Sequence, residues 1–285
     1  MEKQTLFSYF KKRKSDTNKA DYGRALVIAG SYTMSGAAVI CGLATIKSGV
    51  GICEIACEDK VYNIVASSVP EAVFAPISRE VNNEDKLRLK TAIKKASVIV
   101  IGCGMGKSDY TDKILRLVLE HAKVPVIIDA DAINVLSADT ELLNNRNCEV
   151  ILTPHPKEMS RLIGCDVKEI NENRIETATS FSKKYGVVTL LKGHNTVISD
   201  RFGEYTINTS GNAGMATGGS GDMLCGIIAS LVCEGLSAFD ATKVGAYIHG
   251  LSGDISAKKY SLHSTSPLTM LECLPQVFLE IERNI

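Results

Sequence analysis

A glycine-rich stretch followed by an apolar helical pattern, residues 208–232, constrains the fold more than any other part of the chain. Five glycines lie between Gly211 and Gly221. Apolar side chains then recur at the spacing of one helix face: Met223, Leu224, Ile227, Ile228, Leu231 and Val232. Gly235 is a suitable C-terminal stop. The pattern predicts a helix that begins at Gly218-Gly219-Ser220-Gly221.

The start of this helix is a potential anion-binding site. Its free backbone N–H groups and the positive end of its dipole attract negative charge, and glycine lets the backbone approach a phosphate closely. Asp222 lies in the first turn and would repel that phosphate. A phosphoryl-transfer enzyme needs both donors for developing charge and a base for the attacking hydroxyl. The alternative, an ordinary helix-start acid beside a flexible loop, fits this segment equally well.

Short apolar runs alternate with helical segments along most of the chain. The runs are typical of strands that are covered on both faces, as in a parallel sheet: residues 25–29, 52–56, 97–101, 124–128, 149–153 and 187–191, with a last short strand at 205–208. Helices are expected over residues 36–47, 238–256 and 266–282. No repeat or linker divides the sequence. We therefore predict one α/β domain over residues 1–285, with a doubly wound, mostly parallel central sheet flanked by helices. One interpretation of residues 1–20 is a peripheral N-terminal helix.

Polar residues directly follow several of these strands, at the sheet edge where α/β folds bind ligands. The loop 102–106 has the pattern G-x-G-x-G, which is a weak dinucleotide signal. Asp129 and Asp131 could touch a metal–phosphate group or a substrate, although for Asp131 we favour a helix cap. His155 stands between two prolines in an extended, rigid loop, and we expect it to contact a ligand. Lys192, in a hairpin-like or crossover turn, either meets a nucleotide phosphate or is a solvated turn lysine.

Composition excludes several classes of protein. The formal net charge is zero, which does not favour nucleic acid or an anionic membrane as partner. Nine scattered cysteines without a C-x-x-C pair suggest reduced, buried thiols in a cytoplasmic protein rather than disulfides or zinc. There is no apolar signal core and no run long enough to span a membrane. The basic run Lys11 to Lys14 is interpreted as a solvated helix face.

Six segments in order resemble the signatures of the ADP/ATP-dependent NAD(P)H-hydrate dehydratases. They are GSYTMSGAAVICGLATIKSGVG, VIGCGMG, VIIDADAINVL, LTPHPKEM, LLKGHNTVI and GNAGMATGGSGDMLCGIIASL, and together they cover roughly residues 25–233. This family is similar in fold to ribokinase-like small-molecule kinases, whose catalytic anion-hole motif matches Gly219-Ser220-Gly221-Asp222. Sugar kinases usually carry Gly-Ala where this chain has Gly219-Ser220, and this difference favours the dehydratase branch. No added N-terminal epimerase domain is present, so the chain resembles a stand-alone dehydratase.

The resemblance implies a reaction. The substrates would be the 6-hydroxy hydrates of NADH and NADPH, and ADP or ATP would phosphorylate the ring hydroxyl before phosphate leaves. Asp222 would accept the hydroxyl proton, and the amides of Gly219, Ser220 and Gly221 would hold the transferring group. Magnesium would accompany the phosphates, through ligands that the resemblance does not identify. The family also suggests a homotetramer.

The resemblance assigns binding residues as well. Ala37, Gly106, His155 and Asp222 would bind the hydrate; Lys192, Gly193, His194, Asn195, Thr196 and Gly221 would bind the nucleotide. Two rival functions remain open. One is a kinase of a vitamin-precursor alcohol, which uses the same anion hole. The other is a nucleotide sensor without turnover, for which a base at position 222 has no purpose.

Overall fold

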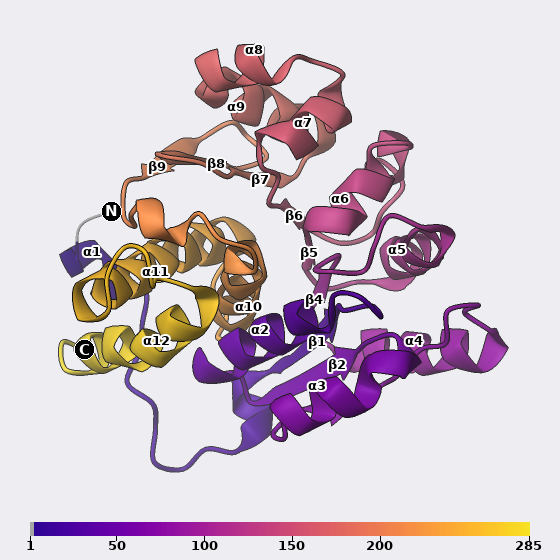
Figure 1. Ribbon diagram of the computed structural model, residues 1–285, viewed down its shortest axis with the longest axis horizontal. Helices are drawn as coiled ribbons and strands as arrows, with labels where there is room; N and C mark the ends of the chain where they lie inside the picture. Colours follow the sequence, from indigo (N-terminus) through magenta and orange to yellow (C-terminus); the bar gives the residue numbers. More distant parts are fainter. Residues whose placement is uncertain (1–2) are drawn as a thin grey trace.

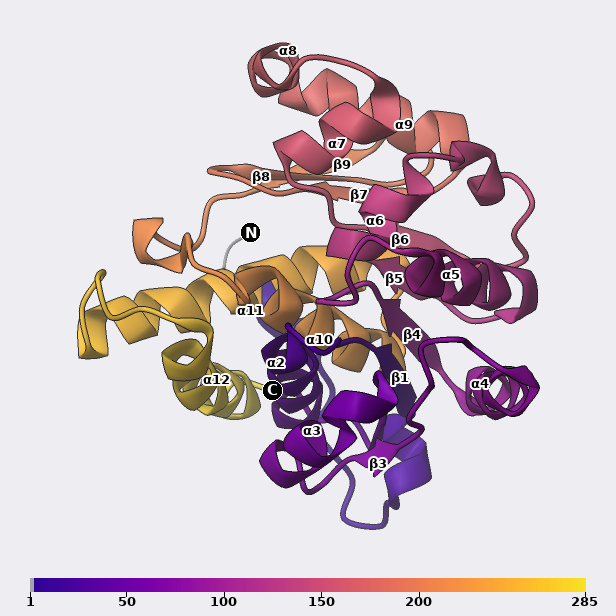
Figure 2. The same cartoon turned by 45° about the vertical axis from the view of Figure 1, so that its right-hand side comes forward.

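The computed structural model describes residues 3–285, which form one sheet covered by helices on both faces (Figures 1 and 2). The nine strands are β1 Arg24–Ile28, β2 Ile52–Ala56, β3 Val73–Phe74, β4 Val98–Ile101, β5 Val126–Ile128, β6 Val150–Leu152, β7 Val188–Leu191, β8 Thr196–Ser199 and β9 Tyr205–Asn208. The helices are α1 Lys3–Phe7, α2 Ser35–Lys47, α3 Tyr62–Ser68, α4 Asn83–Lys95, α5 Asp109–His121, α6 Ala130–Leu136, α7 Pro156–Ile163, α8 Val167–Glu172, α9 Arg174–Tyr185, α10 Ser220–Cys233, α11 Ala238–Lys259 and α12 Pro267–Glu282.

The sheet has the strand order β3-β2-β1-β4-β5-β6-β7-β8-β9. β1 to β7 are parallel, whereas β7, β8 and β9 pair antiparallel as hairpins. The order reverses at β1, which lies between β2 and β4. This is the arrangement of a doubly wound sheet, and ligands bind beside such a reversal at the carboxyl ends of the strands. The predicted fold class is confirmed.

Apolar side chains of the central strands enter two separate cores. Ala25 and Val27 of β1 face a core shared with α2, α10, α11 and α12, whereas Leu26 and Ile28 face a core shared with α4, α5 and α6. Figure 2 shows these helix groups on opposite sides of the sheet. Because both faces are covered, the strands β4 to β7 are buried along their whole length, which is why they appear in the sequence as largely apolar runs.

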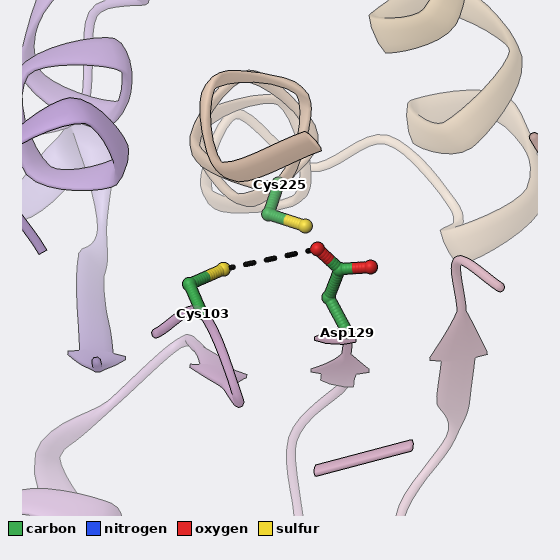
Figure 3. A group of neighbouring side chains, drawn as sticks. All are labelled: Cys103, Asp129 and Cys225. Atoms are coloured by element: carbon green, nitrogen blue, oxygen red, sulfur yellow. Dashed lines mark hydrogen bonds between the residues drawn. The ribbon is translucent and has the colours of Figure 1, made fainter. Parts of the chain in front are cut away.

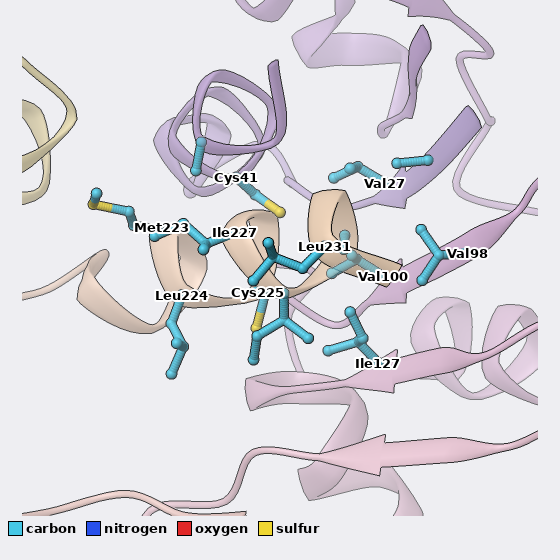
Figure 4. Close-up of a cluster of buried hydrophobic side chains, with 14 of the residues drawn as sticks. Val27, Cys41, Val98, Val100, Ile127, Met223, Leu224, Cys225, Ile227 and Leu231 are labelled. Carbon is cyan, nitrogen blue, oxygen red and sulfur yellow. The ribbon is translucent and has the colours of Figure 1, made fainter. Parts of the chain in front are cut away.

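Helix α10 is the main element of the first core, as its apolar pattern predicts. Its side chains pack on β1, β4 and β5 (Figure 4). A Cβ on Gly226 would lie 2.4 Å from the carbonyl oxygen of Cys41, so only glycine lets α10 lie this close to α2. The packing fixes the start of α10, at Ser220, over the carboxyl edge of the sheet.

The N-terminal segment differs from its prediction. Helix α1 ends at Phe7, and the basic run at residues 11–14 is not helical. Arg13 forms an ion pair with Glu234 at 2.7 Å, donates to the carbonyl of Gly49 and stacks on the ring of Tyr22. The solvated helix face was therefore wrong for Arg13, because its partners are distant in sequence. Residues 1 and 2 of the expected helix lie outside the described residues.

Two further sequence-based expectations have direct outcomes. All nine cysteines are free thiols, as predicted, and Cys165 and Cys233 are partly exposed while the other seven are buried. Within residues 3–285, no helix combines the length and apolar character needed to cross a membrane.

Candidate active site at the carboxyl edge of the sheet

The carboxyl ends of adjacent strands bring three polar side chains together. Ile128 of β5 pairs with Leu152 of β6, so the residues that follow, Asp129 and Thr153, emerge side by side. Asp129 is 1% exposed, and its Oδ1 accepts hydrogen bonds from Lys192 Nζ at 2.6 Å and Thr153 Oγ1 at 2.7 Å. Burial opposes the charged form, but the charge and hydrogen bond of Lys192 hold the pKa of Asp129 below its usual range. Asp129 is therefore a carboxylate at neutral pH.

Lys192 is the cation of this group. It follows β7, and its Nζ also lies 3.8 Å from Oε2 of the buried Glu158. Burial would lower the pKa of Lys192, but the charges of Asp129 and Glu158 raise it above its usual range. The hairpin formed by β7 and β8 confirms the expected turn. The solvated-turn alternative was wrong, because the side chain is only 22% exposed and pairs with buried acids.

The start of α10 faces this ion pair. A Cβ on Gly221 would lie 3.3 Å from Asp129 Oδ2 and 3.4 Å from Lys192 Nζ. Gly219 is the N-cap in a left-handed conformation, and it makes no side-chain cap. The Ser220 amide donates to the carbonyl of Thr217 at 3.3 Å. Within residues 3–285, the amides of Gly219, Gly221 and Asp222 have no acceptor. The open helix start at Gly221 and the ammonium group of Lys192 therefore lie side by side.

Asp222 supplies a base beside these donors. It is half-buried in the first turn of α10. Burial raises its pKa to about 6, and the negative charge of Asp129 adds to the effect, while the contact with Cys103 and the charge of Lys192 oppose it. A carboxyl group with this pKa is ionised at pH 7 and still able to accept a proton, which suits a general base.

Two residues on α11 hold the glycine-rich loop, and sequence reasoning missed both. His249 is 8% exposed, and its Nε2 lies 3.3 Å from Ser220 Oγ. Burial lowers the pKa of His249 to about 4, so the ring is neutral near pH 7. Asp254 accepts hydrogen bonds from the Gly211 amide and the Asn212 side chain. Their only sequence signal is that they are polar residues on a largely apolar helix.

His155 has the extended backbone that its flanking prolines predict, and it also starts a helix. It is the N-cap of α7, and its Nδ1 accepts hydrogen bonds from the amides of Lys157 and Glu158, each at 3.1 Å. The Glu158 carboxylate accepts from the His155 amide at 2.8 Å. Nδ1 therefore carries no proton, and the donor is Nε2–H, which lies 3.3 Å from Glu158 Oε1. The side chain is 43% exposed, so Nε2 can also meet a ligand.

Two variants of His155 distinguish its contribution to stability from its contribution to ligand binding. His155→Ala removes the cap and is expected to cost about 1 kcal/mol of stability, whereas His155→Asn keeps a good capping oxygen. Both remove Nε2, so both should raise the Michaelis constant for the hydrate and leave nucleotide affinity near that of the wild type. Thermal unfolding and calorimetric titration separate the effects. Loss of nucleotide affinity alone would assign His155 to the nucleotide half of the site.

Two other residues expected to bind the hydrate, Ala37 and Gly106, lie around the loop 102–106. A Cβ on Gly104 would lie 2.5 Å from the Cβ of Ala37, so this loop rests on the start of α2. The Gly106 amide donates to Asp131 Oδ2 at 2.8 Å. The expected helix cap at Asp131 was wrong: Asp129 occupies the N-cap position of α6, and Asp131 lies in the first turn and ties down the glycine loop.

The turn 193–196, expected to bind nucleotide, lies between β7 and β8. Thr196 Oγ1 donates to the carbonyl of Gly193, and Asn195 has a positive φ of 56°. The guanidinium of Arg174 packs against Gly193 and donates to the carbonyl of Leu191 at 2.8 Å. Arg174, on α9, is a second cation near this turn that the sequence did not indicate.

The family model for NAD(P)H-hydrate dehydratase matches residues 25–276, and the chain belongs to this family. It is 38% identical over 251 residues to an ADP-dependent (S)-NAD(P)H-hydrate dehydratase of Neisseria meningitidis, with 86% of this chain and 81% of that protein covered. It is 35% identical over 286 residues to a bifunctional NAD(P)H-hydrate repair enzyme of Moorella thermoacetica, covering 98% of this chain and 53% of that protein. The chain thus spans about half the length of that bifunctional relative.

A solved structure supports the same assignment. The ADP/ATP-dependent NAD(P)H-hydrate dehydratase of Bacillus subtilis, co-crystallised with ATP and Mg²⁺, superposes with a TM-score of 0.85 at 30% identity, covering 98% of this chain and 97% of that one. Ribokinase of Arabidopsis thaliana, with a TM-score of 0.54 at 14% identity over 88% of this chain and 98% of that one, shares the fold alone. The predicted family and its ribokinase-like fold are confirmed.

Proposed function

We propose that the protein is a nucleotide-dependent dehydratase, a carbon–oxygen lyase. It converts the S epimers of NADH hydrate and NADPH hydrate into NADH and NADPH, with release of phosphate and of AMP from ADP or ADP from ATP. The observation that carries the proposal is the half-buried Asp222, with its pKa raised to about 6, beside unpaired amides and Lys192. The activities named for the Neisseria and Bacillus relatives support it.

The chemistry divides into two steps. The 6-hydroxyl oxygen attacks the terminal phosphorus of the nucleotide while Asp222 accepts the hydroxyl proton. The bond from phosphorus to the nucleotide breaks, and the amides of α10 stabilise the charge on the transferring group. Phosphate, a far better leaving group than hydroxide, then takes the electron pair of the C6–O bond. The ring nitrogen donates its lone pair, and loss of the proton from C5 restores the ring double bond.

The substrates would lie on either side of Gly221. We assign the nucleotide to Lys192, Gly221 and the turn 193–196, and the hydrate to Ala37, Gly106, His155 and Asp222. Lys192 is the link between the halves, because Asp129 and Glu158 hold its ammonium group beside Gly221. Assembly as a homotetramer belongs to this proposal, and light scattering can check it.

Magnesium fits the site as an ion carried by the nucleotide. Within residues 3–285, the only close group of three potential ligands contains two thiols, so there is no oxygen cage. Mg²⁺ commonly binds substrate phosphates, waters and one or two carboxylates. Asp131 is the candidate protein ligand, because its Oδ2 accepts from Gly106 while its Oδ1 accepts no hydrogen bond from residues 3–285. The ion would neutralise charge on the phosphate oxygens.

Gly221→Ala tests the anion site directly. Gly221 has a helical backbone that alanine can also adopt, so the variant should fold. The added Cβ would lie between Asp129 Oδ2 and Lys192 Nζ, where the phosphoryl group is expected. We expect turnover to fall at least tenfold, about 1.4 kcal/mol in the barrier. Gly36→Ala, in the first turn of α2, is the control for adding a methyl group to a helix, because its added Cβ would have nothing within 4 Å. Wild-type turnover in the Gly221 variant would contradict the assignment.

The function is tested by incubating the protein with NADH hydrate, Mg²⁺ and either ADP or ATP. The expected result is the return of reduced-nicotinamide absorbance together with stoichiometric inorganic phosphate. A phosphorylated alcohol without phosphate release would instead identify a kinase of a vitamin-precursor alcohol. Nucleotide binding without turnover would identify a sensor.

A further inference from the structure

Two thiols that have no part in the proposed reaction meet the carboxylate of Asp129 beneath the start of α10 (Figure 3). Cys103 Sγ, Cys225 Sγ and a carboxylate oxygen of Asp129 all lie within 4.8 Å of one another. Cys103 donates to Asp129 Oδ2 at 4.0 Å. The three groups come from the loop after β4, the end of β5 and the second turn of α10. All three are buried.

The spacing suits a metal ion. Zinc–sulfur bonds of about 2.3 Å and zinc–oxygen bonds of about 2.0 Å place tetrahedral ligands roughly 3.5–3.8 Å apart. Shifts of at most about 1 Å would bring these three atoms to that separation. Two sulfur ligands select thiophilic ions over Mg²⁺, which requires oxygen. Such a site would therefore be separate from the magnesium carried by the nucleotide.

The residues around the cluster would let a metal ion enter and would balance the charge of its ligands. A Cβ on Gly221 would lie 3.3 Å from Asp129 Oδ2, so the oxygen that faces Cys103 also faces the anion loop. An ion can enter from that loop, and its fourth ligand can be water or Asp222, which contacts Cys103. Lys192 supplies positive charge beside two thiolates and a carboxylate. Metal binding would release the two thiol protons to solvent.

We propose that Cys103, Cys225 and Asp129 bind one thiophilic divalent cation, Zn²⁺ or Cd²⁺, at the base of the anion loop. The bound ion draws the Asp129 carboxylate from Lys192 and occupies the space beneath Asp222. Its occupancy therefore inhibits the nucleotide-dependent reaction. Binding is independent of the proposed function, whereas inhibition rests on it.

Cadmium titration of the full chain in excess Mg²⁺ tests binding without reference to activity. The expected result is one Cd²⁺ per chain with the ultraviolet charge-transfer absorption of thiolate–cadmium bonds. Cys103→Ser and Cys225→Ser should each weaken binding by more than the roughly tenfold that loss of an outer-shell partner costs, and the double variant should lose the absorption. Cys165→Ser is the matched control, because Cys165 is partly exposed and outside the cluster.

Each outcome decides the proposal. Absence of the absorption in the wild type, its persistence in the double variant, or its loss in Cys165→Ser overturns the site. Cys103→Ala and Cys225→Ala repeat the test if a serine variant fails to fold. Asp129→Asn keeps both sulfurs, so it should retain the absorption with weaker affinity. Zinc inhibition that remains equal in the double variant would overturn the inhibitory role while leaving the cadmium result intact. A chain without dehydratase activity that still binds Cd²⁺ would instead count against the proposed function.

Discussion

Asp222→Asn is expected to slow turnover by roughly 10²–10⁴, the usual contribution of a positioned general base. Asparagine has nearly the same size and can occupy the first turn of α10, so the fold should be kept. It cannot accept the hydroxyl proton. It also removes a negative charge beside the bound phosphates, so nucleotide affinity should hold or rise slightly.

The role of Asp222 as a base also predicts how turnover depends on pH. In the wild type, Asp222 acts only when ionised, and burial raises its pKa to about 6. Turnover should therefore fall as pH decreases through about 6 and level off above it. The asparagine variant should lack this acidic limb. Steady-state turnover on NADH hydrate, measured from pH 5 to 8 with the nucleotide-induced melting shift, checks both results.

Three outcomes of this experiment have distinct meanings. Lost activity with a normal or larger melting shift supports phosphoryl transfer at the anion loop. Full activity would remove Asp222 from the mechanism, and unfolding would favour a purely structural helix-start acid. Asp112→Asn is a suitable control, because Asp112 is a surface acid on α5, paired with Arg116.

The sequence was most informative where one segment carries its own signal. The strands β1 and β4 were predicted within one residue because each is a short apolar run buried on both faces. Helix α4 was not predicted, because its segment is strongly charged and buries only one face. Its start does carry a local signal, a capping box between Asn82 and Asp85.

The residues of the candidate site were likewise predictable only where they are close together in the sequence. Asp222 and Gly221 were predictable because a glycine-rich loop and the helix that follows are contiguous in sequence. The pairing of Asp129 with Lys192 was not, because the partners are 63 residues apart and meet only through the sheet order. For the same reason, nothing in the sequence indicated that Cys103 lies beside Cys225. Proximity across strand ends depends on topology, which local patterns do not specify.

The Asp129–Lys192 pair should be the most sensitive point of the site for stability. Asp129 is 2% exposed and Lys192 22% exposed as side chains, and their contact is 2.6 Å. Asp129→Asn leaves the ammonium group of Lys192 with only the more distant Glu158, at 3.8 Å, as counter-ion, and Lys192→Met leaves the buried Asp129 carboxylate without its cation. Breaking a buried pair from one side costs about 3–5 kcal/mol, whereas replacing both partners can be nearly neutral.

We therefore expect each single variant to lose about 3 kcal/mol of unfolding free energy, and the double variant to lose less than the sum. Arg116→Met is the matched control, because Arg116 and Asp112 are 46% and 36% exposed and such surface pairs contribute at most about 1 kcal/mol. Urea unfolding of the four variants and the wild type measures the coupling. Additive losses in the double variant would mean that the two charges do not stabilise each other. Lys192 would then be held beside Gly221 by the turn and by Glu158 rather than by Asp129.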